Sequence, residues 1–329
     1  MLSKLASCNK PSLVIGRAGM RLYPDPAGTK TEAATQFVAA LGGSSANIAV
    51  ALRRFNEPVA LVTNVSDDAV GRFVVNQLEN YGVDSSLVRS VAGECRTSLA
   101  IAESRVEDHQ SVIYRNNAAD FTLALSDISD IDFSSYRALI ITGTALTLEP
   151  SRTASLSALR LAKDADIPCI LDLDYRPYSW ESESAAQAVY QQALTYLDAV
   201  IGNDDEFGHM AGGYDEGESY AKRLARSGKW IVYKRGELGS RTFTPVGSSI
   251  DTGIFKVNPL KPTGAGDSFL GGLLASLSRG SSLSDALIDG SACAAMVVTR
   301  VGCAPAMPDL EELTQFKQAA ACPLQSQGV

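Results

Sequence analysis

The chain has 329 residues, of which 45% are hydrophobic and 20% charged, and its formal net charge is −8. This composition is typical of a globular protein, and the acidic balance argues against nucleic acid or an anionic membrane as a partner, because both are bound by basic patches. An anionic small substrate is still possible, since it needs only a local cluster of Arg and Lys. No run of 18 apolar residues occurs, so we expect no membrane span.

The cysteines form no C-x-x-C pair, and only two histidines are available to help bind a metal. Reduced thiols in the cytoplasm are the plain interpretation of this pattern. The length fits one main α/β domain with an appendage.

The first third of the chain mixes strand and helix patterns. Residues 13–16 form an apolar run that ends in glycine, as in a buried first strand, whereas residues 17–37 are rich in Pro, Gly and Thr and do not predict a helix. Gly42 and Gly43 open a predicted helix. A strand over 59–65, a helix over 67–81 and a hairpin of strands over 97–102 and 111–115 follow.

From residue 138 onward, strand and helix patterns alternate steadily. Short apolar runs at 138–142, 169–173, 199–202 and 230–234 are separated by helical stretches around 150–165, 183–197 and 204–226. This alternation predicts βαβ units, with a parallel sheet covered by helices on both faces. Ligands of such sheets bind beyond the carboxyl ends of the strands.

The stretch from Gly264 to Asp267 organises this half of the chain. A β-prone segment at 253–257 precedes it, and the apolar spacing after it predicts a helix that begins at these residues. The first N–H groups of a helix attract anions, and Gly264 and Gly266 allow another molecule to approach the backbone closely. A carboxylate at Asp267 would repel a phosphate, so it suits a general base; the alternative is a helix cap.

Other polar residues follow the predicted strands. Arg115 and Arg176 offer planar forks to a carboxylate or phosphoryl group, or they are surface arginines. Asn203 and Glu206 are spaced as a capping box. The turn with Gly236 and Gly239 suits a bound phosphate, and Lys234 or Arg235 could add charge. No Walker A or G-x-G-x-x-G pattern occurs, so a phosphate site must be built otherwise.

Two motifs, far apart in the chain and in the right order, resemble those of the ribokinase-like (PfkB) carbohydrate kinases. They are Gly264-Ala265-Gly266-Asp267 and Gly42-Gly43-Ser44-Ser45-Ala46-Asn47. Within that family, residues 114–120, 172–177 and 301–305 resemble the 5-dehydro-2-deoxygluconokinases of inositol breakdown. The resemblance covers about residues 11–316.

The resemblance implies a ribokinase-like three-layer α/β/α fold with a mainly parallel sheet and a small β-sheet lid from about 17–40 and 95–122, with tails at 1–10 and 317–329. It implies ATP and Mg²⁺, a sugar-acid substrate and a possible homodimer through the lid. Asp267 would be the base, and Gly264, Ala265 and Gly266 would hold the transferring phosphoryl group. The implied substrate-binding residues are Gly43, Asn47, Arg21, Tyr114, Arg115 and Arg176. The implied nucleotide-binding residues are Asn203, Glu206, Lys234, Gly236, Gly239 and Thr263, with Glu206 also near Mg²⁺.

Three positions depart from the family pattern. Arg21 stands where an Asp usually binds sugar hydroxyls, so either the substrate presents an anion there or activity on the usual substrate is damaged. Lys261 stands where many relatives carry Asp, which puts the monovalent-cation site of some relatives in doubt. Ser291 replaces a common Asn, so that contact near the adenine is not carried over.

The sequence therefore predicts an ATP-dependent kinase for the primary hydroxyl of a keto-sugar acid, best matched by 5-dehydro-2-deoxygluconate. A kinase for 2-keto-3-deoxygluconate or another sugar is one alternative. A catalytically weak nucleotide or sugar-acid sensor is another, supported only by Arg21 and opposed by the intact Asp267, Asn203 and Glu206.

Overall fold

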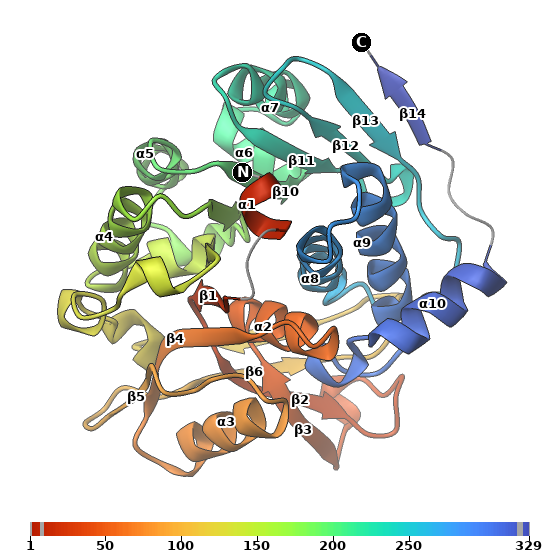
Figure 1. The fold of residues 1–329 in the computed structure, drawn as a ribbon. Coiled ribbons are helices and arrows are strands. Elements are labelled where there is room, and N and C mark those ends of the chain that lie inside the picture. Colours follow the sequence, from red (N-terminus) through yellow and green to blue (C-terminus); the bar gives the residue numbers. More distant parts are fainter. Residues whose placement is uncertain (1, 7–9, 321–324, 329) are drawn as a thin grey trace.

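The fold is seen in a computed structural model that describes residues 2–6, 10–320 and 325–328. One large sheet runs through the molecule, with its strands in the order β14-β13-β12-β11-β10-β9-β8-β1-β4-β5 (Figure 1). Neighbours from β11 to β5 are parallel, whereas β12, β13 and β14 join the edge as antiparallel strands. The strands are β1 Ser12–Ile15, β4 Val59–Ser66, β5 Val88–Val91, β8 Ala138–Thr142, β9 Cys169–Asp172, β10 Ala199–Asn203, β11 Trp230–Lys234, β12 Ser240–Phe243, β13 Ser249–Thr252 and β14 Gln325–Gly328.

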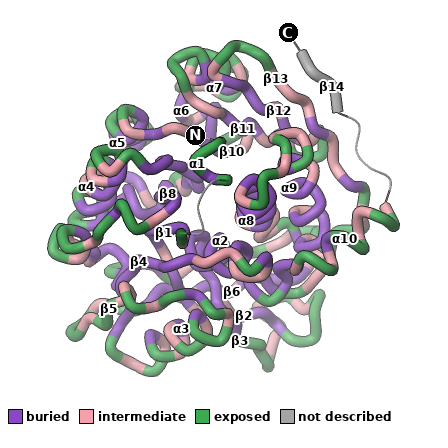
Figure 2. Tube along the Cα trace, in the orientation of Figure 1, coloured by how far each residue is buried: buried purple, intermediate pink, exposed green. Residues whose placement is uncertain are grey.

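Helices cover both faces of this sheet, which explains why its central strands are apolar throughout. In β1, Leu13 and Ile15 pack into one core and Val14 into the other, because successive side chains of a strand point to opposite faces. The buried residues of both cores line the strands and the inner sides of the helices (Figure 2). One core contains residues of α2 Ser44–Arg54, α3 Ala69–Asn80, α8 Ala265–Ser278, α9 Leu283–Val298 and α10 Leu310–Ala319. The other contains residues of α4 Ser151–Asp164, α5 Glu183–Leu194, α6 Asp204–Ala211 and α7 Gly217–Arg226.

A second, four-stranded sheet has the order β3-β2-β6-β7. Its strands are β2 Gly19–Pro24, β3 Phe37–Gly42, β6 Ser98–Ala102 and β7 Ser111–Tyr114. β2, β6 and β7 lie within the two segments that were expected to form a lid, and β3 extends two residues past the end of the first. The three-layer fold with a mainly parallel sheet and a small β-sheet, expected from the sequence, is confirmed.

Several local expectations differ from the structure. The β-prone residues 253–257 form no strand; β13 ends just before them, at Thr252. The helical stretch 204–226 is two helices, since Gly212 takes the left-handed conformation (φ 82°) and ends α6. The expected tails contain α1 Leu2–Ala6, whose Leu5 is buried, the end of α10, and β14, which pairs with β13. None of the helices in the described part of the chain has the length and apolar character needed to cross a membrane.

Candidate active site

The parallel strands bring three polar residues to one edge of the large sheet. Asp172 ends β9 and pairs in register with Ile201 of β10, and Asn203 at the end of β10 pairs with Lys234 at the end of β11. The carboxyl ends of parallel strands share one edge, so segments far apart in the sequence meet here. This edge is where the sequence predicted a ligand site.

Helix α8 begins at this edge. Gly264 is its N-cap residue with φ 89°, a left-handed conformation that favours glycine, and a β-carbon there would stand 3.0 Å from the Sγ of Cys303. The first backbone N–H groups of α8 have no partner within the helix, since the ladder starts with Ser268 N–H donating to the Gly264 carbonyl at 3.0 Å. Gly264, Ala265 and Gly266 therefore present free N–H groups suited to an anion, and this segment is the candidate anion-binding turn.

Asn47, in the first turn of α2, and Asp267, in the first turn of α8, meet directly. Nδ2 of Asn47 donates to Oδ2 of Asp267 at 2.7 Å. The two helices approach closely because Gly271 faces Ala51, where a β-carbon would stand 2.3 Å from the Ala51 Cβ. The Oδ1 of Asn47 is buried without a partner among the described residues, so it is free to accept from a substrate hydroxyl.

Asp267 is suited to proton transfer near neutral pH. Burial, followed by the nearby Asp174 and Asp172 carboxylates, raises its pKa to about 7, while the hydrogen bond from Asn47 and the charge of Lys234 act in the opposite direction. A general base works best when its pKa lies near the operating pH. The structure therefore gives Asp267 the properties expected of the base.

Lys234 brings a positive charge beside the anion-binding turn. A β-carbon added to Gly266 would stand 3.0 Å from Nζ of Lys234, so glycine leaves room for the ammonium group. Burial opposes the charge of Lys234, but the carboxylates around it, chiefly Asp172 and Glu206, outweigh burial and raise its pKa. The ammonium thus balances a cluster of acids and stays available to a phosphoryl oxygen.

Asn203 and Glu206 form the expected capping box. The Asn203 side chain accepts from the Glu206 N–H and the Glu206 carboxylate accepts from the Asn203 N–H, each at 2.8 Å. Burial raises the pKa of Glu206 to about 7, against the attraction of Lys234. The described residues contain no group of three or more metal-ligating side chains. The buried Glu206 carboxylate, with Asp172 nearby, nevertheless fits Mg²⁺, which keeps several waters and is commonly bound by one or two carboxylates and substrate phosphates.

Three arginines, Arg17, Arg21 and Arg115, lie near one another in the same region as Asp174 and Asp267. Arg21 donates to Cys303 Sγ at 3.2 Å and to Ser111 Oγ at 3.3 Å. Arg115 is buried, pairs with Asp120 and donates to the Thr144 carbonyl at 3.0 Å. Burial, and then the neighbouring Arg115, lowers the pKa of Arg17 to about 10.

Each of these three arginines keeps one N–H without a partner. Nε of Arg17, Nε of Arg21 and Nη1 of Arg115 are buried and make no hydrogen bond to any described residue. Unpaired buried donors are costly, so such a set is a candidate site for an anion. Arg17 was missed in the sequence, although an arginine directly after the glycine that follows β1 was a usable signal.

Two other predicted substrate residues are placed differently from these three. Arg176 pairs with Asp174 at 2.5 Å and reaches Glu206 at 3.9 Å, and the charges of Arg17 and Arg115 act on the same Asp174 carboxylate. Tyr114 pairs in register with Leu99, whereas Arg21 pairs with Ala100. Because neighbouring residues of a strand face opposite ways, Tyr114 lies on the other face of the small sheet from Arg21, and it is 56% exposed. The structure does not bring Tyr114 into the site.

The remaining predicted site residues are three glycines with positive φ and Thr263. Gly43 has φ 100° and lies against the Arg17 carbonyl, 2.4 Å from where a β-carbon would be. Gly236 and Gly239 also have positive φ; Gly236 begins a short 3₁₀ turn after β11, and Gly239 follows its end. Thr263 directly precedes the anion-binding turn, and its carbonyl accepts from Lys261.

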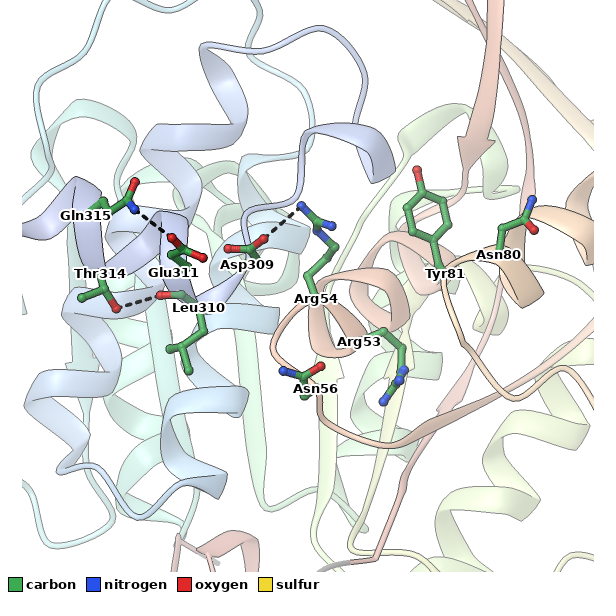
Figure 3. A pocket seen from close by; sticks show the side chains of 10 residues that line it. All are labelled: Arg53, Arg54, Asn56, Asn80, Tyr81, Asp309, Leu310, Glu311, Thr314 and Gln315. Atoms are coloured by element: carbon green, nitrogen blue, oxygen red, sulfur yellow. Dashed lines mark hydrogen bonds and ion pairs between the residues drawn. The ribbon is translucent and has the colours of Figure 1, made fainter.

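A surface pocket of about 880 Å³ lies away from these residues, between α2, the end of α3 and α10 (Figure 3). Its Arg54 lies at the opposite end of α2 from Asn47 and is paired with Asp309 and Glu312. Carboxylates share the pocket with the arginines, so it offers no anion site comparable to that at Asp267.

The chain is similar to known proteins along nearly its whole length. The family model described as pfkB family carbohydrate kinase matches residues 10–310. The 5-dehydro-2-deoxygluconokinase of Photobacterium profundum is 38% identical over 310 residues, covering 93% of this chain and 94% of the relative, and that of Clostridium tetani is 35% identical over 308 residues, covering 92% and 91%. A fructokinase double mutant from Vibrio cholerae, solved with fructose, ADP and potassium ion, has a TM-score of 0.81 at 26% identity, covering 93% of this chain and 98% of that one.

Proposed function

Because the chain belongs to the pfkB family of carbohydrate kinases, we propose that it transfers the γ-phosphoryl group of ATP to the terminal hydroxyl of 5-dehydro-2-deoxygluconate. The resemblance seen in the sequence motifs is thereby confirmed, and so is the kinase activity that it implied. The observation that carries the choice of a sugar acid is the set of unpaired donors on Arg17, Arg21 and Arg115, which fits a carboxylate.

We place the two ends of the substrate at two parts of the site. The carboxylate binds to the three arginines, and the terminal hydroxyl at the other end of the sugar chain lies beside Asn47 and Asp267. Arg21 connects the two parts, since the Cys303 sulfur that it contacts also packs against Gly264. The acidic cluster with Arg176 and Glu206 lies on the phosphate side, and Mg²⁺ bound with ATP there would neutralise phosphate charge.

The reaction follows from the arrangement at the start of α8. The Asp267 carboxylate accepts the proton of the hydroxyl, whose oxygen forms a bond to the γ-phosphorus as the bond to the bridging oxygen of ADP breaks. The free N–H groups of the turn and the Lys234 ammonium stabilise the charge on the phosphoryl oxygens. The proton then leaves Asp267 with the release of products.

A substrate comparison tests the proposal. With Mg-ATP we expect ADP release to be faster for the two acids than for fructose and ribose, because only the acids can pair with the arginines. Of the acids, we expect 5-dehydro-2-deoxygluconate to react faster than 2-keto-3-deoxygluconate, because the relatives are kinases of the former. A charge-assisted hydrogen bond contributes about 1.5–3 kcal/mol, so acids and neutral sugars should differ by on the order of 10–100-fold in kcat/KM. Equal rates for fructose and the acids would contradict a sugar-acid site, and turnover of none of them would favour a sensor.

We also propose a cytoplasmic homodimer that forms through the small sheet. Its face opposite Arg21 is apolar and open: Phe37, Val112 and Tyr114 are exposed there, beside the partly exposed Leu22 and Ile101. Burying such a face against a second copy would remove apolar area from water. The described cysteines are free thiols, as expected in the cytoplasm.

Val112→Glu should convert the dimer to a monomer, because it places a charge among the exposed apolar side chains of this face. Val246→Glu is the matched control, since Val246 is exposed in the turn after β12, and it should leave the dimer intact. Light scattering coupled to size exclusion measures both. A wild-type protein that is monomeric at all concentrations, or a dimer that persists in Val112→Glu, would rule out this interface.

A further inference from the structure

Lys261 is a buried cation whose charge the reaction described above does not use. The residue has 0% exposure, and it is among the largest fully buried side chains of the protein. Its Nζ donates to the Thr263 carbonyl at 2.6 Å and to the Val297 carbonyl at 3.1 Å. Its hydrogen-bond partners among the described residues are thus backbone carbonyls and not carboxylates.

Both carbonyls that hold this ammonium group flank the anion-binding turn. Thr263 directly precedes Gly264, and Val297 lies in the last turn of α9, where carbonyl groups carry the negative end of the helix dipole. The N–H groups of Leu260 and Lys261 also donate to the next carbonyl of that turn, Val298, at 2.7 and 3.1 Å. The loop before α8 is therefore attached to the end of α9 through Lys261.

This arrangement also sets the position of Gly264. A β-carbon there would stand 3.0 Å from Val297 Cγ1, so the turn packs directly on the residue whose carbonyl Lys261 binds. Burial lowers the pKa of Lys261, which means that keeping the charge inside costs stability. A neutral side chain of similar length would fill the same space without that cost. The charge of Lys261 therefore does not serve the stability of the fold. Its role is to hold the anion-binding turn in position.

We propose that Lys261 is a positioning residue that acts as a built-in monovalent cation, holding the Thr263 and Val297 carbonyls so that the N–H groups at the start of α8 stay aimed at the transferring phosphoryl group. Uncharged backbone oxygens are also the groups that bind a free potassium or ammonium ion. The enzyme therefore needs no added monovalent cation. The inference rests on the proposed kinase function, and it makes Lys261 the residue that holds the anion-binding turn of that kinase in place.

Two substitutions distinguish the effect of the Lys261 charge from the effect of the volume of its side chain. Lys261→Ala leaves a cavity between the two carbonyls, whereas Lys261→Met fills most of that cavity with an uncharged chain. We expect kcat to fall on the order of 10–100-fold in both, with little change in KM for the sugar acid, because the turn contacts the phosphoryl group and small misplacements there are costly. Ammonium, methylammonium or potassium chloride should restore most of the loss in Lys261→Ala and little in Lys261→Met.

The wild-type enzyme provides a test that needs no variant. Its rate should change less than about twofold when potassium chloride replaces choline chloride at equal ionic strength, a difference too small to reflect a bound activating cation. Strong activation of the wild type by potassium would overturn the proposal, and so would wild-type kcat in Lys261→Met or a loss in Lys261→Ala that no cation restores. If the wild type phosphorylates none of the sugars, the kinase proposal itself fails, and that result is distinct from all of these.

Discussion

Asp267→Asn should lower kcat on the order of 10²–10⁴-fold while ATP affinity stays within a few-fold of wild type. The amide keeps the shape of the side chain but cannot accept the hydroxyl proton, and the nucleotide is held by other groups, including Lys234 and the free N–H groups of α8. ADP release at saturating substrate measures kcat, and calorimetric titration with the nucleotide measures affinity. Retained turnover, or lost ATP binding, would contradict the role of Asp267 as the base.

The pH dependence provides an independent control for this prediction. The pKa of Asp267 is raised to about 7, so its carboxylate form is lost as the pH falls through 7. The kcat/KM of the wild type for the sugar acid should therefore rise with pH to a plateau, with a midpoint near 7, and the residual activity of Asp267→Asn should lack that rise. A wild-type profile that is flat between pH 6 and 8 would argue against this carboxyl group.

The raised pKa of Asp267 also predicts the thermal stability of Asp267→Asn. A raised carboxyl pKa means that the folded protein binds this proton more tightly than the unfolded chain, so its contribution to stability is lost as the pH rises from the ordinary Asp range toward 7. At pH 8 the ionised Asp267 is thus a cost to the folded state. Asp267→Asn should therefore melt at the same temperature as the wild type or higher, which separates lost chemistry from lost folding.

Arg21→Asp should reduce kcat/KM for 5-dehydro-2-deoxygluconate on the order of 10²-fold, mainly through KM. The change removes a donor that faces the site and puts a carboxylate near the substrate carboxylate and near Asp267. Fructose, which has no carboxylate, should lose far less. Steady-state kinetics with both substrates measure the ratio.

The opposite result would be equally informative. Arg21 stands where relatives usually carry Asp, so a damaged enzyme should regain activity in Arg21→Asp, whereas a site that uses Arg21 as an anchor should lose it. Arg21→Gln is the control: it removes the charge and the guanidinium donors without adding a carboxylate, and we expect an intermediate loss on the acid. Higher activity of Arg21→Asp on the acid would favour the interpretation of the wild type as a weakened enzyme or sensor.

The sequence by itself determined the class of fold and the place where α8 begins. Local signals were enough there: apolar runs of strand length alternate with helical patterns, and a glycine-rich turn before an apolar helix face puts Asp267 in the first turn of that helix. The capping box of Asn203 and Glu206 was equally readable, because both partners are three residues apart.

Only the tertiary structure decided which of the charged residues share a site. The contact of Asn47 with Asp267 joins residues 220 positions apart, and the contact of Arg21 with Cys303 spans 282. The face on which Tyr114 lies depends on strand register, and the environment of Arg17 depends on the packing of three separate segments. Such relations arise from packing between distant elements, which no local pattern encodes. For the same reason the buried place of Lys261 between two carbonyls could not be read from the chain, since a lysine in a loop is ordinarily solvated.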